Sequence, residues 1–215
     1  DFQRAMALSP EFAPAHGYYA NLLTALGRPD EALAQAERAR QLDPLWVIIP
    51  FNVSLALICA RRFEEAERQM RDLMDLDSRL EGTYWFLSSA LAGQGRIDEA
   101  ITVLEKGVPL VFRAPFFLAL LGLWYARAGR RGDAEAVLAE LLAGGFCPPV
   151  WLAILCGGLG HIDRAFGYLE QAIEQHNDQV CFMGVDHRFD ELRRDPRFPV
   201  LMTRIGLPLA LLPSA

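Results

Sequence analysis

A repeat of 34 residues dominates the sequence. The segments GRPDEA, RRFEEA, GRIDEA, GRRGDA and GHIDRA begin at Gly27, Arg61, Gly95, Gly129 and Gly160, with spacings of 34, 34, 34 and 31 residues. An alanine follows five residues after each start, at Ala32, Ala66, Ala100, Ala134 and Ala165. A period of this length is typical of arrays in which each unit buries its apolar face against the next unit.

Each unit is expected to form two helices joined by a tight turn. The glycine suits the left-handed backbone conformation that ends a first helix. The acids that follow, such as Asp30 and Glu31, then lie in the first turn of a second helix, where the helix dipole favours negative charge. Apolar residues recur at intervals of three and four, as in Ala32, Ala36 and Ala39, which is the helical spacing. The segment that ends at Pro10 matches the segment that ends at Pro44. We therefore expect the chain to open on the second helix of a repeat.

The period, the turn glycine, the alanine and the closing proline at Pro44 resemble the tetratricopeptide repeat over residues 1–176. The resemblance implies an all-α fold, a right-handed α-solenoid of stacked antiparallel helix pairs. Two kinds of departure stand out. Arg61 replaces the turn glycine, and three other residues replace the closing proline: Ser78, Phe112 and Phe146.

Residues 177–215 are expected to form a C-terminal cap segment and tail that cover the last open face of the solenoid. Asp195 and Pro196 predict a helix start and Gly206 predicts its end. The stretch FDELRRDPRF resembles segments that close tetratricopeptide arrays in bacterial signalling proteins. In those proteins the array commonly follows a DNA-binding, nucleotide-cyclase or protein-kinase domain, so we expect such a domain before Asp1.

Composition and motifs exclude several classes of function. The net charge of −6 argues against nucleic acid as the partner, because phosphate binding needs a basic face. The longest apolar runs, 114–126 and 148–160, are shorter than the ~20 residues that cross a bilayer. No GxSxG, phosphate-binding loop or HExxH motif is present, so we expect neither catalysis nor a cofactor.

The remaining cysteine, histidine and arginine residues are expected to have structural roles. The four cysteines form no CxxC pair, which favours free thiols and a reducing, cytoplasmic location. The periplasmic side of a membrane-anchored regulator stays open as an alternative. His176, Cys181, Asp186 and His187 do not have the spacing of a zinc site, and Asp186 is expected to cap a helix. For Arg127, Arg130 and Arg131, at the end of a first helix, we expect a solvated helix end, with a docking patch as the alternative.

The family resemblance also implies a ligand-binding surface. In that family the first helices of successive units line a concave groove. The matching positions here hold Tyr18, Asn21, Phe51, Asn52, Leu55, Ile58, Trp85, Phe86, Ser89, Phe116, Leu120 and Leu123. The family's carboxylate clamp uses two asparagines with cationic neighbours. Asn21 and Asn52 match the asparagines, but Gly17, Gly82 and Phe86 occupy the cationic places. Without those charges we expect no carboxylate clamp, and the asparagines are left to pair with the backbone of a bound peptide.

These residues predict an apolar, aromatic groove that binds a protein or peptide segment without catalysis. Three alternatives stay open at this stage. Tight curvature could bury the same residues as core, a second copy of the chain could pack against them in a homodimer, or the groove could hold a small hydrophobic ligand as a sensor.

Overall fold

The computed structural model describes residues 1–212, and these residues form helices joined by short turns, without a strand. The α-helices are α1 (Phe2–Leu8), α2 (Ala13–Ala25), α3 (Pro29–Leu42), α4 (Ile49–Cys59), α5 (Phe63–Leu76), α6 (Glu81–Gly93), α7 (Ile97–Gly107), α8 (Pro115–Arg127), α9 (Arg131–Ala143), α10 (Pro149–Gly158), α11 (Ile162–Glu174) and α12 (Arg197–Arg204). Short 3₁₀ helices are η1 (Val108–Val111), η2 (Asp178–Phe182), η3 (His187–Phe189) and η4 (Leu209–Leu211). The expected all-α solenoid is confirmed.

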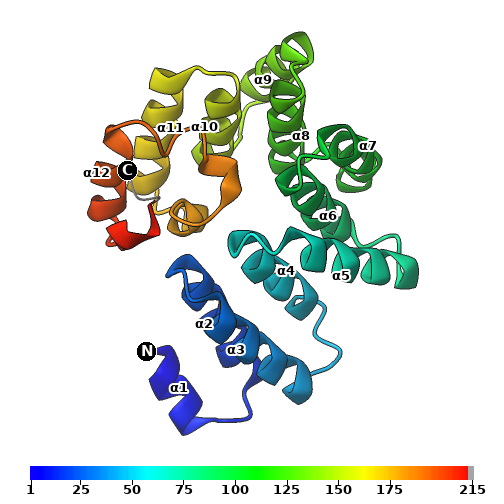
Figure 1. Ribbon diagram of the computed structural model, residues 1–215, viewed down its shortest axis with the longest axis vertical. Helices are drawn as coiled ribbons and strands as arrows, with labels where there is room; N and C mark the ends of the chain where they lie inside the picture. The colour runs from blue at the N-terminus through cyan, green and yellow to red at the C-terminus, as the bar shows by residue number, and fades with distance from the viewer. Residues whose placement is uncertain (213–215) are drawn as a thin grey trace.

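Five helix pairs, α2/α3, α4/α5, α6/α7, α8/α9 and α10/α11, stack in sequence order (Figure 1). Helix α1 packs against α2, in the place of the second helix of a preceding unit. The array curves strongly, so that the segment between α11 and α12 returns toward the ends of α2 and α4 on the inside of the curve (Figure 1). This return places the C-terminal part of the chain on the concave face.

The turn inside each pair has the same construction. The residue at the turn has a positive φ of 69° at Gly27, 79° at Gly95, 75° at Gly129 and 76° at Gly160, and Arg61 takes the same conformation with φ 61°. The next backbone N–H then donates back into the first helix, as from Arg28 to the Leu23 carbonyl at 2.9 Å. This bond satisfies a carbonyl that the helix end would leave unpaired.

A repeated ion pair explains the arginine and acid of each turn motif. The arginine that precedes the second helix pairs with the acid three residues later at 2.7 Å in four units, Arg28–Glu31, Arg62–Glu65, Arg96–Glu99 and Arg130–Asp133. These pairs are exposed to solvent, so water weakens their attraction. The acids in the first turn of these second helices therefore interact with this arginine as well as with the helix dipole.

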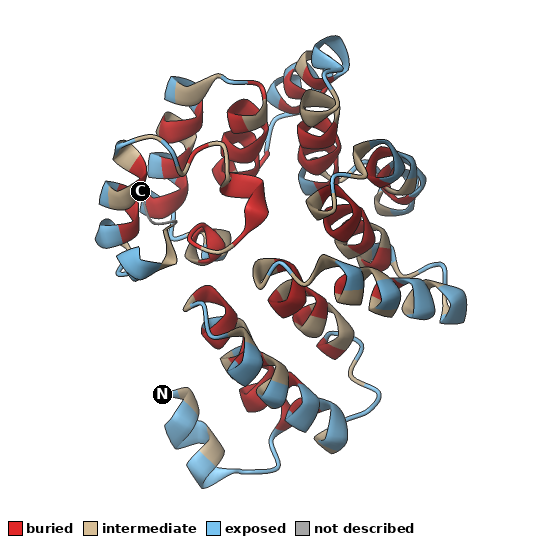
Figure 2. Ribbon diagram, in the orientation of Figure 1, coloured by how far each residue is buried: buried red, intermediate tan, exposed pale blue. Residues whose placement is uncertain are grey.

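The core is unevenly distributed along the array. The five repeat alanines are fully buried, because the helices approach closely there: Ala32, Ala66, Ala100, Ala134 and Ala165. One large cluster runs from Met70 to Leu207, whereas the first two pairs have two small separate clusters. Buried residues accordingly concentrate in α6 to α12, and α1 buries none (Figure 2). We infer that the N-terminal end is held less firmly than the C-terminal half.

Within residues 1–212 no helix has the length and apolar character needed to cross a membrane. The four cysteines, Cys59, Cys147, Cys156 and Cys181, are free thiols as expected.

Candidate functional site: the concave face

The concave face is partly occupied by the chain itself. We call residues 183–193 the inner segment, because they follow η2, include η3 and lie inside the curve of the array (Figure 1). Asp186 caps η3 by accepting a hydrogen bond from the Arg188 backbone N–H at 2.9 Å, which confirms its expected capping role. Asp186, His187, Arg188 and Phe189 are all buried.

Arg188 is the central contact of the inner segment. Its guanidinium carbon lies 5.2 Å from the ring centre of Trp85 and 5.3 Å from that of Trp151, within range of cation–π attraction to both. Its Nε donates to the Asp186 carboxylate at 2.8 Å. Burial disfavours the charged form of Asp186, but the neighbouring Arg188 outweighs burial and holds the pKa of Asp186 well below its usual range. The buried charge pair is thus enclosed by aromatic rings from α6 and α10.

His187 anchors the inner segment to α5 and α8. Its ring stacks on Trp124 with centroids 5.8 Å apart and meets the edge of Phe63 at 5.3 Å. Burial lowers the pKa of His187 to about 3, and Arg127 and Arg188 act in the same direction against the opposing Asp186. His187 is therefore neutral at neutral pH.

Arg127, the last residue of α8, also connects that helix to the inner segment. Its guanidinium donates to the His187 carbonyl at 2.8 Å and to both carboxylate oxygens of Glu191 at 2.7 and 2.8 Å. The expectation of a solvated helix end is wrong for Arg127, because the inner segment covers it and supplies its partners. Of its two neighbours, Arg130 pairs with Asp133, and Arg131 donates to the Leu159 carbonyl at 2.9 Å.

The twelve sequence-predicted groove residues have very different exposure. Six are buried: Asn52, Ile58, Trp85, Ser89, Leu120 and Leu123. Four are half-buried, Asn21, Phe51, Leu55 and Phe86, and two are exposed, Tyr18 at 54% and Phe116 at 38%. The buried six have acquired partners in the fold; for example, the Asn52 amide donates to the Gly17 carbonyl at 3.3 Å.

The accessible aromatic side chains among these residues are Tyr18, Phe51, Phe86 and Phe116, which we call the aromatic strip. The rings of Phe51 and Phe86 stack with centroids 5.6 Å apart, and Phe116 lies 5.5 Å from Trp85. Asn21 adds a polar atom, since its Oδ1 is buried without a hydrogen-bond partner among the described residues.

The two glycines at cationic places of the clamp lie under aromatic rings. A Cβ at Gly17 would come within 2.7 Å of a Trp46 ring atom, and one at Gly82 within 2.7 Å of a Phe51 ring atom. Larger side chains would displace these rings, so the packing explains why glycine occupies both positions. The rings cover the places where the clamp carries its positive charge.

Among residues 1–212, no group of three or more His, Cys, Asp or Glu side chains is arranged to hold a metal ion. The contacts of the concave face are instead aromatic, apolar and arginine-mediated, which suits recognition of a polypeptide segment.

Comparisons with known proteins agree with this architecture. A model described as tetratricopeptide repeat matches residues 13–38 and 82–106. A search of curated proteins found no match.

Among solved structures, the chain is similar to a thermophilic TPR protein of Thermus thermophilus, with 26% identity and a TM-score of 0.61 over 84% of this chain and 98% of that one. It is also similar to a tetratricopeptide repeat protein from Parabacteroides merdae, with 15% identity and a TM-score of 0.67 over 89% and 75% of the two chains. A third similar structure is PilF of Pseudomonas aeruginosa, with 17% identity and a TM-score of 0.55 over 85% and 84%. The last two show a common fold.

Proposed function

This chain belongs to the tetratricopeptide repeat family, and we propose that it is a binding scaffold that holds a protein or peptide segment on its concave face without catalysis. The observation that carries the proposal is the inner segment itself. This short stretch, with only one turn of 3₁₀ helix, is held on the concave face by Trp85, Trp151 and Arg127.

The aromatic strip is the part of the face that we assign to an external partner. Exposed aromatic side chains grouped on one face usually mark an interaction site, and aromatic anchors supply much of the energy of interfaces. Phe51, Phe86 and Phe116 are the proposed anchors, and the unpaired Asn21 oxygen is a candidate acceptor for a backbone N–H of the partner. Trp85 is buried with its ring centre 5.5 Å from that of Phe116 and so supports the strip, whereas the buried Asn52 amide is used within the fold.

We further propose a regulatory role for this scaffold. The proposal rests on the FDELRRDPRF segment, which resembles those that close such arrays in bacterial signalling proteins. In the structure this segment begins with the last residues of the inner segment and continues into α12. A partner that binds the aromatic strip would therefore contact the same face that the C-terminal segment occupies.

A peptide-display selection tests the scaffold function. Peptides selected against the natural chain should lose at least tenfold in affinity for a Phe51→Ala, Phe116→Ala double variant, because anchors of this kind each contribute about 1 kcal/mol or more. The matched control is Phe146→Ala, which removes a phenylalanine that is 76% exposed and lies in the loop before α10.

Two results would contradict the proposal. Selected peptides that bind the folded double variant and the natural chain equally would exclude the aromatic strip as their site. Light scattering could also show that the natural chain is a dimer and that the double variant is a monomer. That result would assign the strip to self-association instead.

A further inference from the structure

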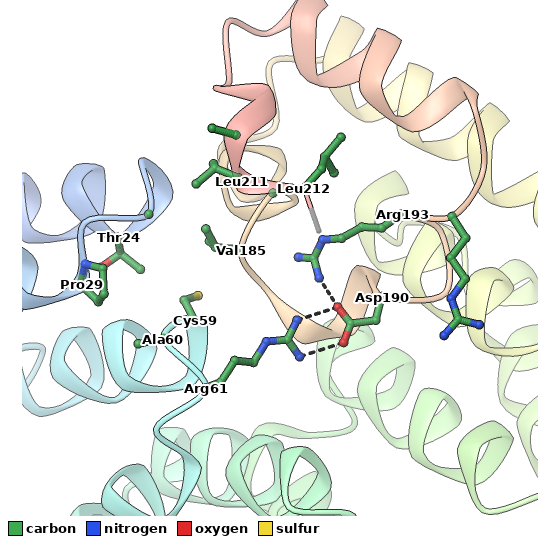
Figure 3. Close-up of a pocket in the computed structure, with 14 residues that line it drawn as sticks. Thr24, Pro29, Cys59, Ala60, Arg61, Val185, Asp190, Arg193, Leu211 and Leu212 are labelled. Carbon is green, nitrogen blue, oxygen red and sulfur yellow. Dashed lines mark hydrogen bonds and ion pairs between the residues drawn. The ribbon is translucent and has the colours of Figure 1, made fainter. Parts of the chain in front are cut away.

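A second site lies away from the aromatic strip. A cavity of about 670 Å³ separates the turns after α2 and α4 from the C-terminal segment (Figure 3). Its walls come from distant parts of the chain. Thr24, Gly27 and Pro29 lie on one side and Cys59 to Arg61 below, and the opposite wall is formed by Gly184, Val185, Asp190, Arg193, Arg194 and residues 210–212. The volume falls within the range of about 300–1,000 Å³ that is common for small-molecule sites.

The charged side of the cavity has more positive than negative groups. The guanidinium groups of Arg61 and Arg193 both point to the single carboxylate of Asp190 (Figure 3). Arg61 makes a two-pronged contact with Asp190 at 2.7 and 2.8 Å, and Arg194 also lines the cavity. The other nearby carboxylate, Asp186, is already paired with Arg188. One carboxylate therefore pairs with two guanidinium groups, those of Arg61 and Arg193.

Arg193 lies beside the cavity with its side chain almost fully buried. Its side chain is only 6% exposed, and its Nη2 donates to the carbonyls of Met183 and Asp186 at 2.8 and 2.6 Å. Its Nε is buried and has no hydrogen-bond partner within residues 1–212. Because this Nε has almost no accessible surface, a molecule in the cavity cannot contact it, and Arg193 contributes positive charge rather than a free donor. The Arg61 side chain is 46% exposed and is the guanidinium that a ligand can reach.

The opposite side of the cavity is apolar. Val185, Leu211 and Leu212 lie above the arginines, and Pro29 and Ala60 close the side nearest α3 and α4 (Figure 3). The neutral Cys59 thiol adds no charge, because burial raises its pKa well above the usual value. An apolar wall beside an excess of guanidinium groups favours a molecule with an anionic head and a hydrocarbon body.

We propose that this cavity binds a small organic acid whose carboxylate pairs with Arg61, beside the positive charge of Arg193, and whose apolar chain lies against Val185 and Leu211. The identity of residue 61 supports this site. The equivalent turn residue is glycine in the other four units, and the left-handed conformation is unfavourable for arginine. Arg61 therefore places its guanidinium at the cavity, although its left-handed backbone conformation is unfavourable.

Octanoate is the probe that tests the site, measured by isothermal titration calorimetry on the full 215-residue chain. Octanoate should bind, whereas octanamide, which has the same length without the charge, should bind at least tenfold more weakly, and octylamine should not bind. Equal binding of octanoate and octanamide, or no octanoate binding at millimolar concentrations, would overturn the proposal.

Two variants should change octanoate affinity in opposite directions. Arg61→Gly removes one cation and restores the glycine found in other turns, and it should weaken binding by roughly tenfold to a hundredfold. Asp190→Asn removes the competing carboxylate and should strengthen binding severalfold. Arg79→Gly, in an exposed loop outside the cavity, is the matched control and should leave affinity unchanged. If neither Arg61→Gly nor Asp190→Asn changes the affinity of a folded chain, the charged cluster is not the site.

Discussion

Arg61 shows how a single residue can join two distant parts of this fold. It occupies the turn position where the other four units have glycine, with φ 61°, and its guanidinium contacts Asp190. A left-handed non-glycine residue costs roughly 1 kcal/mol or more. An ion pair of this exposure contributes up to about 1 kcal/mol. The two contributions nearly cancel.

This balance predicts a difference between two variants. Arg61→Gly should stay within about 1 kcal/mol of the natural chain, because relief of backbone strain offsets loss of the ion pair. Asp190→Asn should cost about 1–3 kcal/mol, because it relieves no strain and leaves the buried Arg193 without its carboxylate. Urea unfolding of both variants measures these free energies. A larger loss for Arg61→Gly than for Asp190→Asn would contradict this account of the turn.

His187 predicts a loss of stability in mild acid. Its pKa is about 3 in the folded chain, against about 6.5 for an unperturbed histidine. The stability that depends on neutral His187 is fully present above pH 6.5 and declines as pH falls toward 3. Between pH 6.5 and about 5, where carboxylates still stay ionised, the free energy of unfolding should drop by up to roughly 2 kcal/mol.

A His187→Phe variant provides the control for this pH dependence. It retains a ring against Trp124 and Phe63 but has no group that titrates. Urea unfolding between about pH 7 and 5 should give a much flatter profile for this variant. If the variant loses as much stability over this range as the natural chain, another group carries the pH dependence.

At the scale of helices, close packing decides which small residues are required. Gly122 in α8 faces α9 and α10, and a Cβ there would lie 2.8 Å from a Leu155 methyl and 3.0 Å from a Val137 methyl. Gly167 in α11 is a matched mid-helix glycine, where an added Cβ would meet no heavy atom within 4 Å apart from its chain neighbours and the nearby backbone of its own helix. The two positions therefore separate packing from helix propensity.

We expect alanine to have opposite effects at these two glycines. Gly122→Ala should destabilise the chain by about 1–3 kcal/mol, because its buried neighbours cannot move without repacking the core. Gly167→Ala should stabilise it by about 0.5–1 kcal/mol through helix propensity alone. Thermal unfolding of both variants checks the prediction, and stabilisation by both would show that α8 and α10 are less closely packed than described.

The helical elements were predictable from sequence because their signals are local. Period, turn glycine and alanine together indicated the paired helices, and Asp195 and Gly206 indicated the last one. Asp195 accepts a hydrogen bond from the Arg197 backbone N–H at 2.9 Å, and Gly206 has φ 74° at the helix end. These features depend on residues within a few positions of each other.

The concave site was less predictable because its contacts join residues far apart in the chain. Alignment with the family named the groove positions, but it contained no information that Trp85 and Trp151 enclose Arg188. The one available signal was Arg61, an exception to the turn glycine whose partner is 129 residues away. Exposure of the groove positions likewise depends on these long-range contacts, so it differs between positions that are equivalent in the repeat.

The whole molecule is a curved array closed by its own C-terminal segment. The inner segment contacts α5, α6, α8 and α10, and Arg61 links the second unit to Asp190. A Cβ at Gly27 would lie 2.3 Å from a Leu211 methyl, so the first unit also contacts the C-terminal end closely. Closure defines both proposed sites, because it covers part of the concave face and completes the cavity beside Arg61.

Double electron–electron resonance between spin labels at Asp30 and Arg194 tests this closure most directly. Labels carried on a noncanonical amino acid avoid the four native cysteines, and labels at Asp30 and Glu64, equivalent residues of adjacent repeats, give a reference distribution for a rigid array. We predict one short, narrow distance distribution for Asp30 and Arg194, comparable in width to the reference. A broad distribution extending to long distances, with a narrow reference, would show an open array and contradict the account.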